Sequence, residues 1–330
     1  MVNAGTATVR DCVAVLEAAF PHAWAESWDA VGLAVGDPDA PVTSVLFAVD
    51  PTLEVAAEAA RGAQLLVTHH PLFLRGVHGV AETGAGGRVV ATLIRAGAAL
   101  FTAHTNADVA DPGVSDALAA AIGLRHVTSL APDSPPGSSR PPGAQPGTPQ
   151  TPGSTPRTPQ TPGTSPGSPQ AQPPAATALP VAAAGLVATS CRGLGRIGEL
   201  PAPEPLGDFC ARVARALPAT AAGVRATGAA DRLVHRVAVC GGAGGELVGA
   251  AGAAGADVLV TADGRHHHVL DAVGAHPVAV VDVAHWASEW PWLGQAAARL
   301  RAGLAARGRT VSTSVSAIVT DPWRLHVPSL

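Results

Sequence analysis

The stretch Leu65-Leu66-Val67-Thr68-His69-His70-Pro71-Leu72-Phe73 says most about the fold. Its aliphatic run, bounded by Gly62 and Pro71, predicts a buried strand. Proline cannot donate a hydrogen bond to a neighbouring strand, so the strand must end at the two histidines. His69 and His70 therefore follow the carboxyl end of a strand, where open α/β sheets bind their ligands. Adjacent side chains of an extended chain point in opposite directions, which suits two metal ions, or one ion and a supporting contact, better than a single ion. A turn with two polar residues is the alternative.

The composition narrows the class of protein. The chain has 330 residues and is 47% hydrophobic, which is enough for two domains of ordinary size. The net charge of −4, without an arginine cluster interleaved with aromatic residues, gives no reason to expect nucleic-acid binding. The four cysteines lack C-x-x-C spacing, which argues against a disulfide framework and a thiolate zinc site. We see no signal peptide or membrane span and expect a soluble cytoplasmic protein.

Strands and helices alternate along the chain. The predicted strands are residues 43–49, 64–68, 98–102, 233–240, 257–261, 278–283 and 310–319, and the predicted helices are residues 6–20, 52–61, 87–95, 114–122, 206–217, 245–254, 266–273 and 286–307. Residues 193–198 predict a glycine-rich turn. The alternation is typical of a mostly parallel α/β layer.

One part of the sequence repeats another. Gly-Ala-Gln-Leu-Leu-Val-Thr at residues 62–68 matches Gly-Ala-Asp-Val-Leu-Val-Thr at residues 255–261. Each copy follows a predicted helix and precedes a second short strand that starts after Gly-Ala. This order indicates an internal duplication. We therefore predict a first α/β half at residues 1–130 and a second at residues 179–330.

Between the halves the composition changes sharply. Residues 132–174 are almost entirely Pro, Gly, Ser, Thr and Gln. Such a segment cannot bury enough apolar surface to offset its ordering entropy. We predict a disordered insertion at residues 131–178; a proline-rich ligand for a partner domain is a second interpretation.

Polar residues follow other predicted strands. His104 and Asp108 come after the strand at 98–102, on the same sheet edge as His69 and His70 if the sheet is parallel. His285 and Glu289 come after the strand at 278–283 and face the same side of a helix by their i, i+4 spacing. Turn and capping chemistry is the alternative for the first pair, and a favourable helix dipole for the second.

Three consecutive histidines form another candidate. His266, His267 and His268 follow the repeated strand and resemble a metal-binding tract by composition. A metal site needs convergent geometry rather than a run of ligands, so residues that support the ligands, or a solvated helix start, are the alternatives.

The polar residues together predict a dinuclear metal site. The candidate ligands are His69, His70, Asp108, His285 and Glu289. Imidazole and carboxylate donors without thiolates suit Zn, Mn or Fe. Five side chains are too few to complete two coordination shells, so water would fill the open positions and could be activated by the metals. Glu289 could bridge the ions, and His104 or His267 could transfer protons or support the ligands.

These motifs resemble the NIF-three-like family, whose bacterial members are named GTP cyclohydrolase 1 type 2 homologues. The resemblance rests on these motifs: Trp28-Asp29 with Val31-Gly32-Leu33 and Gly36-Asp37, Val67 to Leu72, His104-Thr105-Asn106 with Asp108, Gly195 to Gly198, Thr261 with Asp263, His266-His267, and His285 to Glu289. It covers nearly all of the chain outside the proline-rich segment. Ala262, where a glycine is usual, and Val109 to Pro112 depart from the family pattern.

The resemblance implies a duplicated three-layer α/β/α fold with mostly parallel or mixed sheets. It also implies a dinuclear site formed by the five ligands above and a ring-shaped homohexamer. The family name suggests metal-dependent opening of the guanine ring of GTP, although the chain contains no G-x-x-x-x-G-K-[ST] phosphate loop.

Three functions remain open at this stage. The first is a metal-dependent hydrolase that acts on a nucleotide or related small molecule through metal-activated water. The second is a non-catalytic metal-binding scaffold, a metal chaperone or a regulatory protein. The third is a protein-interaction module that uses the proline-rich segment.

Overall fold

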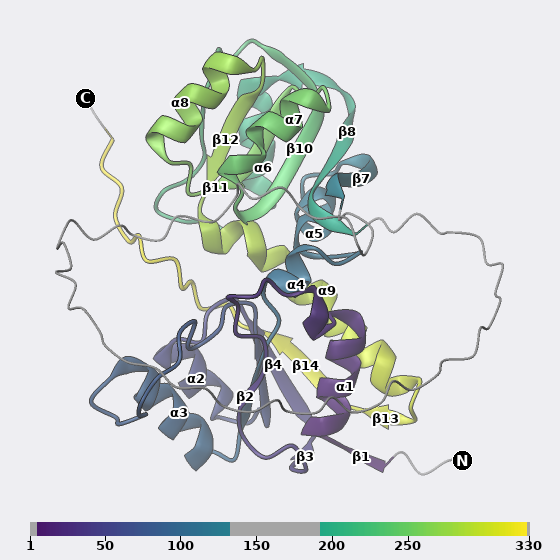
Figure 1. The fold of residues 1–330 in the computed structure, drawn as a ribbon, viewed down its shortest axis with the longest axis vertical. Coiled ribbons are helices and arrows are strands. Elements are labelled where there is room, and N and C mark those ends of the chain that lie inside the picture. Colours follow the sequence, from purple (N-terminus) through teal and green to yellow (C-terminus); the bar gives the residue numbers. More distant parts are fainter. Residues whose placement is uncertain (1–4, 133–191, 329–330) are drawn as a thin grey trace, which may run out of the picture. The chain divides into compact units, whose positions relative to one another are not determined.

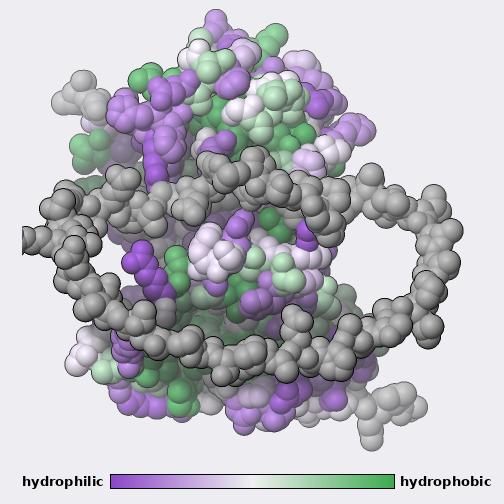
Figure 2. Space-filling model, in the orientation of Figure 1, coloured by the Kyte–Doolittle hydropathy of each residue, from purple (hydrophilic) through white to green (hydrophobic). Residues whose placement is uncertain are grey.

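The computed structural model describes residues 5–132 and 192–328 (Figure 1). The predicted disordered insertion, residues 131–178, lies outside these ranges except for its first two residues, which end a strand. None of the helices in the described ranges is long and apolar enough to cross a membrane. On the face drawn in Figure 2, hydrophilic and hydrophobic side chains are interspersed over the described surface.

The stretch at residues 65–73 supplies the middle strand of a five-stranded sheet. This strand, β5 (Leu65–Thr68), is buried at all four residues. The strand order is β14-β4-β5-β6-β2, and only β2 runs antiparallel to its neighbour. The other strands are β2 (Gly32–Val35), β4 (Ser44–Ala48), β6 (Ala99–Thr102) and β14 (Ser312–Val315). Since β14 lies near the C-terminal end of the chain, this sheet combines strands from distant parts of the sequence.

A second sheet has six strands in the order β7-β8-β10-β11-β12-β9. Its centre is β10, β11 and β12, which run parallel to one another. β8 runs antiparallel to both β7 and β10, and β9 runs antiparallel to β12. The strands are β7 (Arg125–Pro132), β8 (Gly193–Pro205), β9 (Arg225–Ala226), β10 (Leu233–Ala243), β11 (Val258–Ala262) and β12 (Ala279–Val283).

The two sheets repeat the same order of elements. The first half contains β4-α2-β5-α3-β6 and the second contains β10-α7-β11-α8-β12. The helices are α2 (Leu53–Ala59), α3 (Ala85–Arg95), α7 (Val248–Ala253) and α8 (His266–Ala275). The two repeated sequence stretches thus supply the middle strand of each parallel array. The predicted mixed α/β class is confirmed.

Both faces of each sheet are buried, because alternate residues belong to different core clusters. In β5, Leu65 and Val67 belong to the largest cluster, whereas Leu66 packs in a second cluster with residues of α2 and α3. In β11, Val260 belongs to the same largest cluster and Leu259 to a third one. One core is therefore shared between the two sheets, and each outer face has a core of its own.

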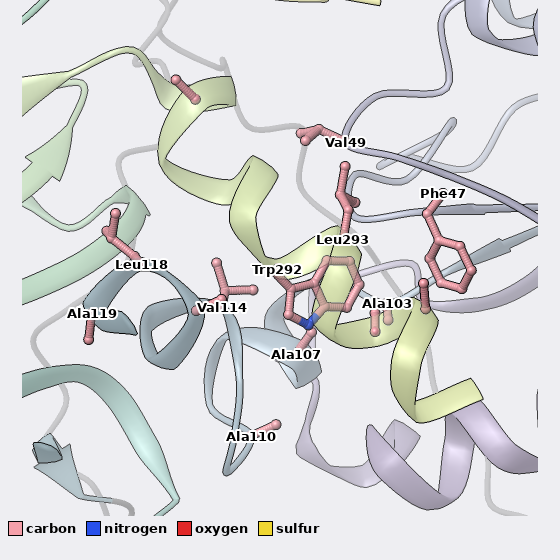
Figure 3. Packing of buried hydrophobic residues seen from close by; sticks show 14 of the residues in the cluster. Phe47, Val49, Ala103, Ala107, Ala110, Val114, Leu118, Ala119, Trp292 and Leu293 are labelled. Carbon is pink, nitrogen blue, oxygen red and sulfur yellow. The ribbon is translucent and has the colours of Figure 1, made fainter. Parts of the chain in front are cut away.

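A long helix, α9 (His285–Ala305), supplies much of the shared core. It packs against α1 (Val9–Ala19) and α5 (Val114–Ala121), and also against β4 and β10. Figure 3 shows Trp292 and Leu293 of α9 among small residues such as Ala107. Trp292 is fully buried, and its ring lies 5.5 Å from that of Phe20 in an edge-to-face contact. This helix ties the two halves together.

The remaining elements are short or peripheral. They are β1 (Gly5–Thr8), β3 (Pro41–Val42) and β13 (Arg309–Thr310), which form a three-stranded sheet, together with α4 (Thr105–Asp108), α6 (Leu206–Ala216) and two 3-10 helices, His22–Trp24 and Gly245–Leu247.

Three local predictions were wrong. The strand predicted at residues 310–319 is split into the short strands β13 and β14, and residues 316–319 form no strand. Residues 6–8, predicted as the start of a helix, form the end of β1, because the Thr8 hydroxyl accepts a hydrogen bond from the Asp11 amide and caps α1 there. Residues 193–198, predicted as a turn, are the first part of β8. Gly195 has a φ of +68°, so the strand bends without ending.

Candidate metal centre

Four histidines and two carboxylates gather where strands of both sheets end. His69 and His70 directly follow β5, and His104 lies between β6 and α4, the short helix that ends at Asp108. His285 begins α9 just after β12, and Glu289 lies one turn further along that helix. The cluster therefore lies at the carboxyl edge of the parallel strands, as the sequence predicted.

Glu289 lies at the centre of this cluster. Its Oε1 is 2.9 Å from Nε2 of His285 and 3.4 Å from Nε2 of His69. Its Oε2 is 3.1 Å from Nε2 of His70. Oδ1 of Asp108 is 3.5 Å from the same Nε2 atom of His69. All five predicted ligands are thus brought together.

Each histidine ring is oriented by a hydrogen bond from its Nδ1 atom. His70 donates to Asp50 at 2.7 Å, and His285 donates to Asp263 at 2.7 Å. In the same way His104 donates to Asp29 at 2.8 Å. The fourth histidine, His69, donates from Nδ1 to the carbonyl oxygen of Ala103 at 2.9 Å. Histidines that ligate metals are usually oriented by such contacts, which leave Nε2 available as the ligand atom.

Burial and neighbouring charges shift the pKa values of the clustered side chains, often in opposite directions. Burial lowers the pKa of His70 and His285, but nearby carboxylates outweigh this effect and raise the values to about 10 and about 11. The pKa of His69 is raised too, because Glu289 and Asp108 outweigh its burial. Burial acts to raise the pKa of Glu289, yet the surrounding histidines hold it well below its usual range. Burial raises the pKa of Asp108.

The donor set fits a metal. Within the described part of the chain, His69 Nε2 and Glu289 Oε2 are buried and make no well-aligned hydrogen bond, although charged groups of the cluster lie 3.1–3.5 Å away. A buried polar atom without a hydrogen bond costs about 1–3 kcal/mol, which a bound cation would reduce. Two groups, His69–His70–His104 and His70–His285–Glu289, each place one ligand atom per residue within 4.8 Å of the others. Imidazoles and a carboxylate are suitable donors for Zn, Mn or Fe.

The two residues considered for proton transfer lie in different places. His104 belongs to the cluster, and its ring centroid is 5.2 Å from that of His69. His267 is exposed on α8, and its ring contacts that of His266 with centroids 5.2 Å apart. The described contacts of His267 therefore do not include the cluster.

Three carboxylates that contact the histidines were given no role by the sequence reasoning, although Asp29 and Asp263 belong to the motifs quoted for the resemblance. Asp50 follows β4 and Asp263 follows β11, so both lie after the carboxyl ends of parallel strands, as the predicted ligands do. Asp29, in the loop before β2, accepts hydrogen bonds from His104 and from the Thr105 amide. A search for acidic residues after every predicted strand would have found the first two.

A glycine makes room for the central carboxylate. Gly242, near the end of β10, has a φ of +68°, and a Cβ atom there would lie 2.5 Å from Oε1 of Glu289. The amide of Gly242 donates to the Ser288 hydroxyl at 2.8 Å. A side chain at this position would displace Glu289.

The segment that carries Asp108 is anchored by a buried arginine. Arg196 of β8 is 2% exposed and pairs with both carboxylate oxygens of Asp116 at 2.8 Å. It also donates to the carbonyl oxygen of Ala110 at 2.5 Å. Asp116 in turn accepts from the Gly113 amide at 2.7 Å. β8 of the second sheet thereby fixes the chain just after Asp108.

These features define a class of protein: a duplicated mixed α/β fold whose two halves share one histidine–carboxylate cluster. The chain belongs to the Duf34/NIF3 (NGG1p interacting factor 3) family, whose profile matches residues 7–322. The resemblance inferred from the motifs is confirmed.

Similar proteins support this assignment. A Streptomyces coelicolor protein named GTP cyclohydrolase 1 type 2 homolog is 43% identical over 322 residues, which cover 97% of this chain and 95% of the relative. A Mycobacterium tuberculosis protein of the same name is 41% identical over 372 residues, covering 96% and 97%. Among solved structures, a Bacillus cereus protein related to NIF3 matches with a TM-score of 0.75 at 24% identity, covering 97% of this chain and 99% of the other. A Staphylococcus aureus hypothetical protein matches with a TM-score of 0.74 at 26% identity and the same coverage.

Proposed function

We propose that the cluster holds two divalent transition-metal ions and that the protein is a metal-dependent hydrolase of a nucleotide or related small molecule. The observation that carries this proposal is the convergence of three histidine Nε2 atoms on the buried Glu289 carboxylate, where His69 Nε2 makes no hydrogen bond. Zn, Mn or Fe, when bound, would supply Lewis-acid polarisation of a substrate oxygen and activation of water.

The ligands divide between two positions. His69, with Asp108 and His104 on its side of the cluster, would hold one ion. His285, on the other side, would hold the second ion. His70 belongs to both groups of convergent ligand atoms. Glu289 lies near His69, His70 and His285 and would be shared between the two positions.

His104 is the best-placed residue for moving a proton. Its ring is 5.2 Å from His69 and 5.4 Å from His70 between centroids, and Asp29 fixes its Nδ1. A histidine oriented by a carboxylate is a usual general acid or base. If His104 serves as a ligand instead, replacing it will lower metal content rather than turnover alone.

An exposed tryptophan supports a substrate with a planar ring. Trp28 is 44% exposed, and its ring contacts His104 with centroids 6.0 Å apart. Its neighbour Asp29 is fixed by His104 and by the Thr105 hydroxyl, so the indole is held beside the cluster. Several relatives are named after GTP, which makes a guanine compound the first candidate to test.

Replacing Trp28 by alanine is expected to weaken guanosine binding to the metal-loaded protein about tenfold. Stacking of a base on an aromatic side chain contributes about 1–3 kcal/mol, and about 1.4 kcal/mol corresponds to tenfold. Trp28→Phe retains a ring and should retain most of the affinity. Calorimetric titration with guanosine, and with ribose as the probe that lacks the base, measures the effect. Trp323→Ala, which removes another exposed indole, is the matched control. Equal guanosine affinity in the Trp28→Ala and wild-type proteins would contradict a stacking role.

Turnover separates the hydrolase from a metal-binding scaffold. Metal-loaded protein is assayed with GTP, cyclic amidines and a panel of phosphoesters, beside a Glu289→Gln variant. The proposal requires metal-dependent turnover of at least one of these compounds that the variant lacks. Retained metal without turnover of any of them would favour a scaffold, a metal chaperone or a regulatory protein.

We also propose a homohexamer, on the strength of the family resemblance alone. Light scattering coupled to size-exclusion chromatography of the full chain measures the assembly mass. A monomer at all concentrations would remove this part of the proposal.

A further inference from the structure

The chain beyond β14 returns to the sheet edge that carries the metal cluster. Residues 316–328 form no helix or strand and are drawn as an extended yellow trace in Figure 1. Ser316 is buried; its amide donates to Phe47 O at 2.8 Å and its hydroxyl to Glu58 Oε2 at 2.5 Å. Ile318 and Val319 then pack against different core clusters. These contacts hold the backbone in place up to Thr320.

Thr320 reaches the outer layer of the site through one carboxylate. Its hydroxyl donates to Oδ2 of Asp50, which lies 270 positions earlier in the chain. The other oxygen, Oδ1, accepts from Nδ1 of His70 at 2.7 Å. Nε2 of His70 is in turn 3.1 Å from Glu289. A continuous chain of polar contacts therefore runs from the C-terminal segment to the centre of the cluster.

Because the side chains of Asp50 and His70 are partly exposed, the contact with Thr320 contributes to their orientation. The side chain of Asp50 is 27% exposed and that of His70 is 21% exposed, so packing alone does not fix their orientation. Asp321, immediately after Thr320, is 2% exposed, and its Oδ1 accepts from the Trp323 amide at 3.5 Å. With both Asp50 oxygens engaged, the carboxylate cannot rotate freely, and the imidazole plane of His70 is set.

We propose that Thr320 is a positioning residue for His70, acting through Asp50, so that the C-terminal segment completes the metal site. This inference rests on the proposed metal-binding function. Groups that orient metal-ligating histidines typically change metal affinity by about 10–100-fold when they are replaced. If Thr320 only anchored the C-terminal segment to Asp50, its replacement would lower the stability of the protein but not the metal affinity in particular.

The test compares Thr320→Val, which keeps the shape and removes the hydroxyl, with Thr320→Ser, which keeps the hydroxyl. Zinc affinity of the full-length protein is measured by competition with a chelator, and the melting temperature is measured without metal. Thr320→Val should weaken zinc binding at least about tenfold, and Thr320→Ser should match the wild type. Thr310→Val, an exposed threonine of β13, is the control for the substitution itself.

A double-mutant cycle shows whether Thr320 affects zinc affinity through Asp50. In an Asp50→Ala background, Thr320→Val should cause no further loss of zinc affinity, because the two residues act as one unit. Equal zinc affinity in wild type and Thr320→Val, or the same loss in both backgrounds, would overturn the inference.

A second measurement needs no metal. Histidine ring nitrogen resonances of the metal-free protein should show a shift for His70 in Thr320→Val. The His285 ring, which Asp263 holds, should be unaffected. An unchanged His70 resonance would overturn the inference even if the protein binds no zinc. Absence of zinc binding in the wild type would instead count against the proposed function.

Discussion

Replacing Glu289 by glutamine is expected to lower the metal affinity of the protein by more than about 100-fold. The carboxylate lies within 3.4 Å of Nε2 atoms from three histidines, and it is 3% exposed. Glutamine has nearly the same shape but lacks the charge and the second ligand oxygen. Loss of a supporting residue alone costs about 10–100-fold, so loss of a shared ligand should exceed that range.

The measurement is zinc affinity by chelator competition, together with metal content after purification. Glu17→Gln, at an exposed position on α1, is the matched control and should behave as the wild type. Circular dichroism confirms that the Glu289→Gln variant is folded. A folded Glu289→Gln protein that binds two metals as tightly as the wild type would contradict the assigned role.

Truncation of Trp292 to alanine is expected to lower the free energy of unfolding by about 3–5 kcal/mol. The side chain is fully buried between the two sheets, in contact with Phe20 and with the ring of His69 at 5.3 Å. Removing a large buried aromatic side chain loses its transfer free energy and leaves a cavity. Since the indole supports His69, the same change should also weaken metal binding.

Trp292→Phe separates the two contributions of the indole. Its Nε1 is buried without a hydrogen bond within the described residues, so phenylalanine removes no favourable polar contact. The phenylalanine variant should therefore be much more stable than the alanine variant in urea-induced unfolding. An alanine variant as stable as the wild type would show that α9 is not the shared core element described above.

The central strands could be predicted because their sequence pattern is local. The repeat at residues 62–68 and 255–261 corresponds to β5 and β11 at the middle of each parallel array. His285 and Glu289 could be paired because four residues on a helix return to the same face. In both cases the pattern that allows the prediction lies within a short stretch of sequence.

The supporting residues could not be predicted because their partners are distant. Arg196 is a buried charge in a glycine-rich strand, and its carboxylate partner Asp116 lies 80 positions away. Asp50 depends on His70 and on Thr320, which only the tertiary structure brings together. The pairing of β14 with β4 likewise joins opposite ends of the chain, a pairing that no local periodicity encodes.

The most direct test of the account is a crystal structure of the metal-loaded protein with anomalous difference maps recorded at the edge of the loaded metal. The account predicts two peaks per chain, one beside Nε2 of His69 and one beside Nε2 of His285, with Glu289 between them. For zinc, each peak should lie about 2.0–2.1 Å from its histidine nitrogen. Metal bound only elsewhere, for example along His266 to His268, with no peak at Glu289, would contradict it.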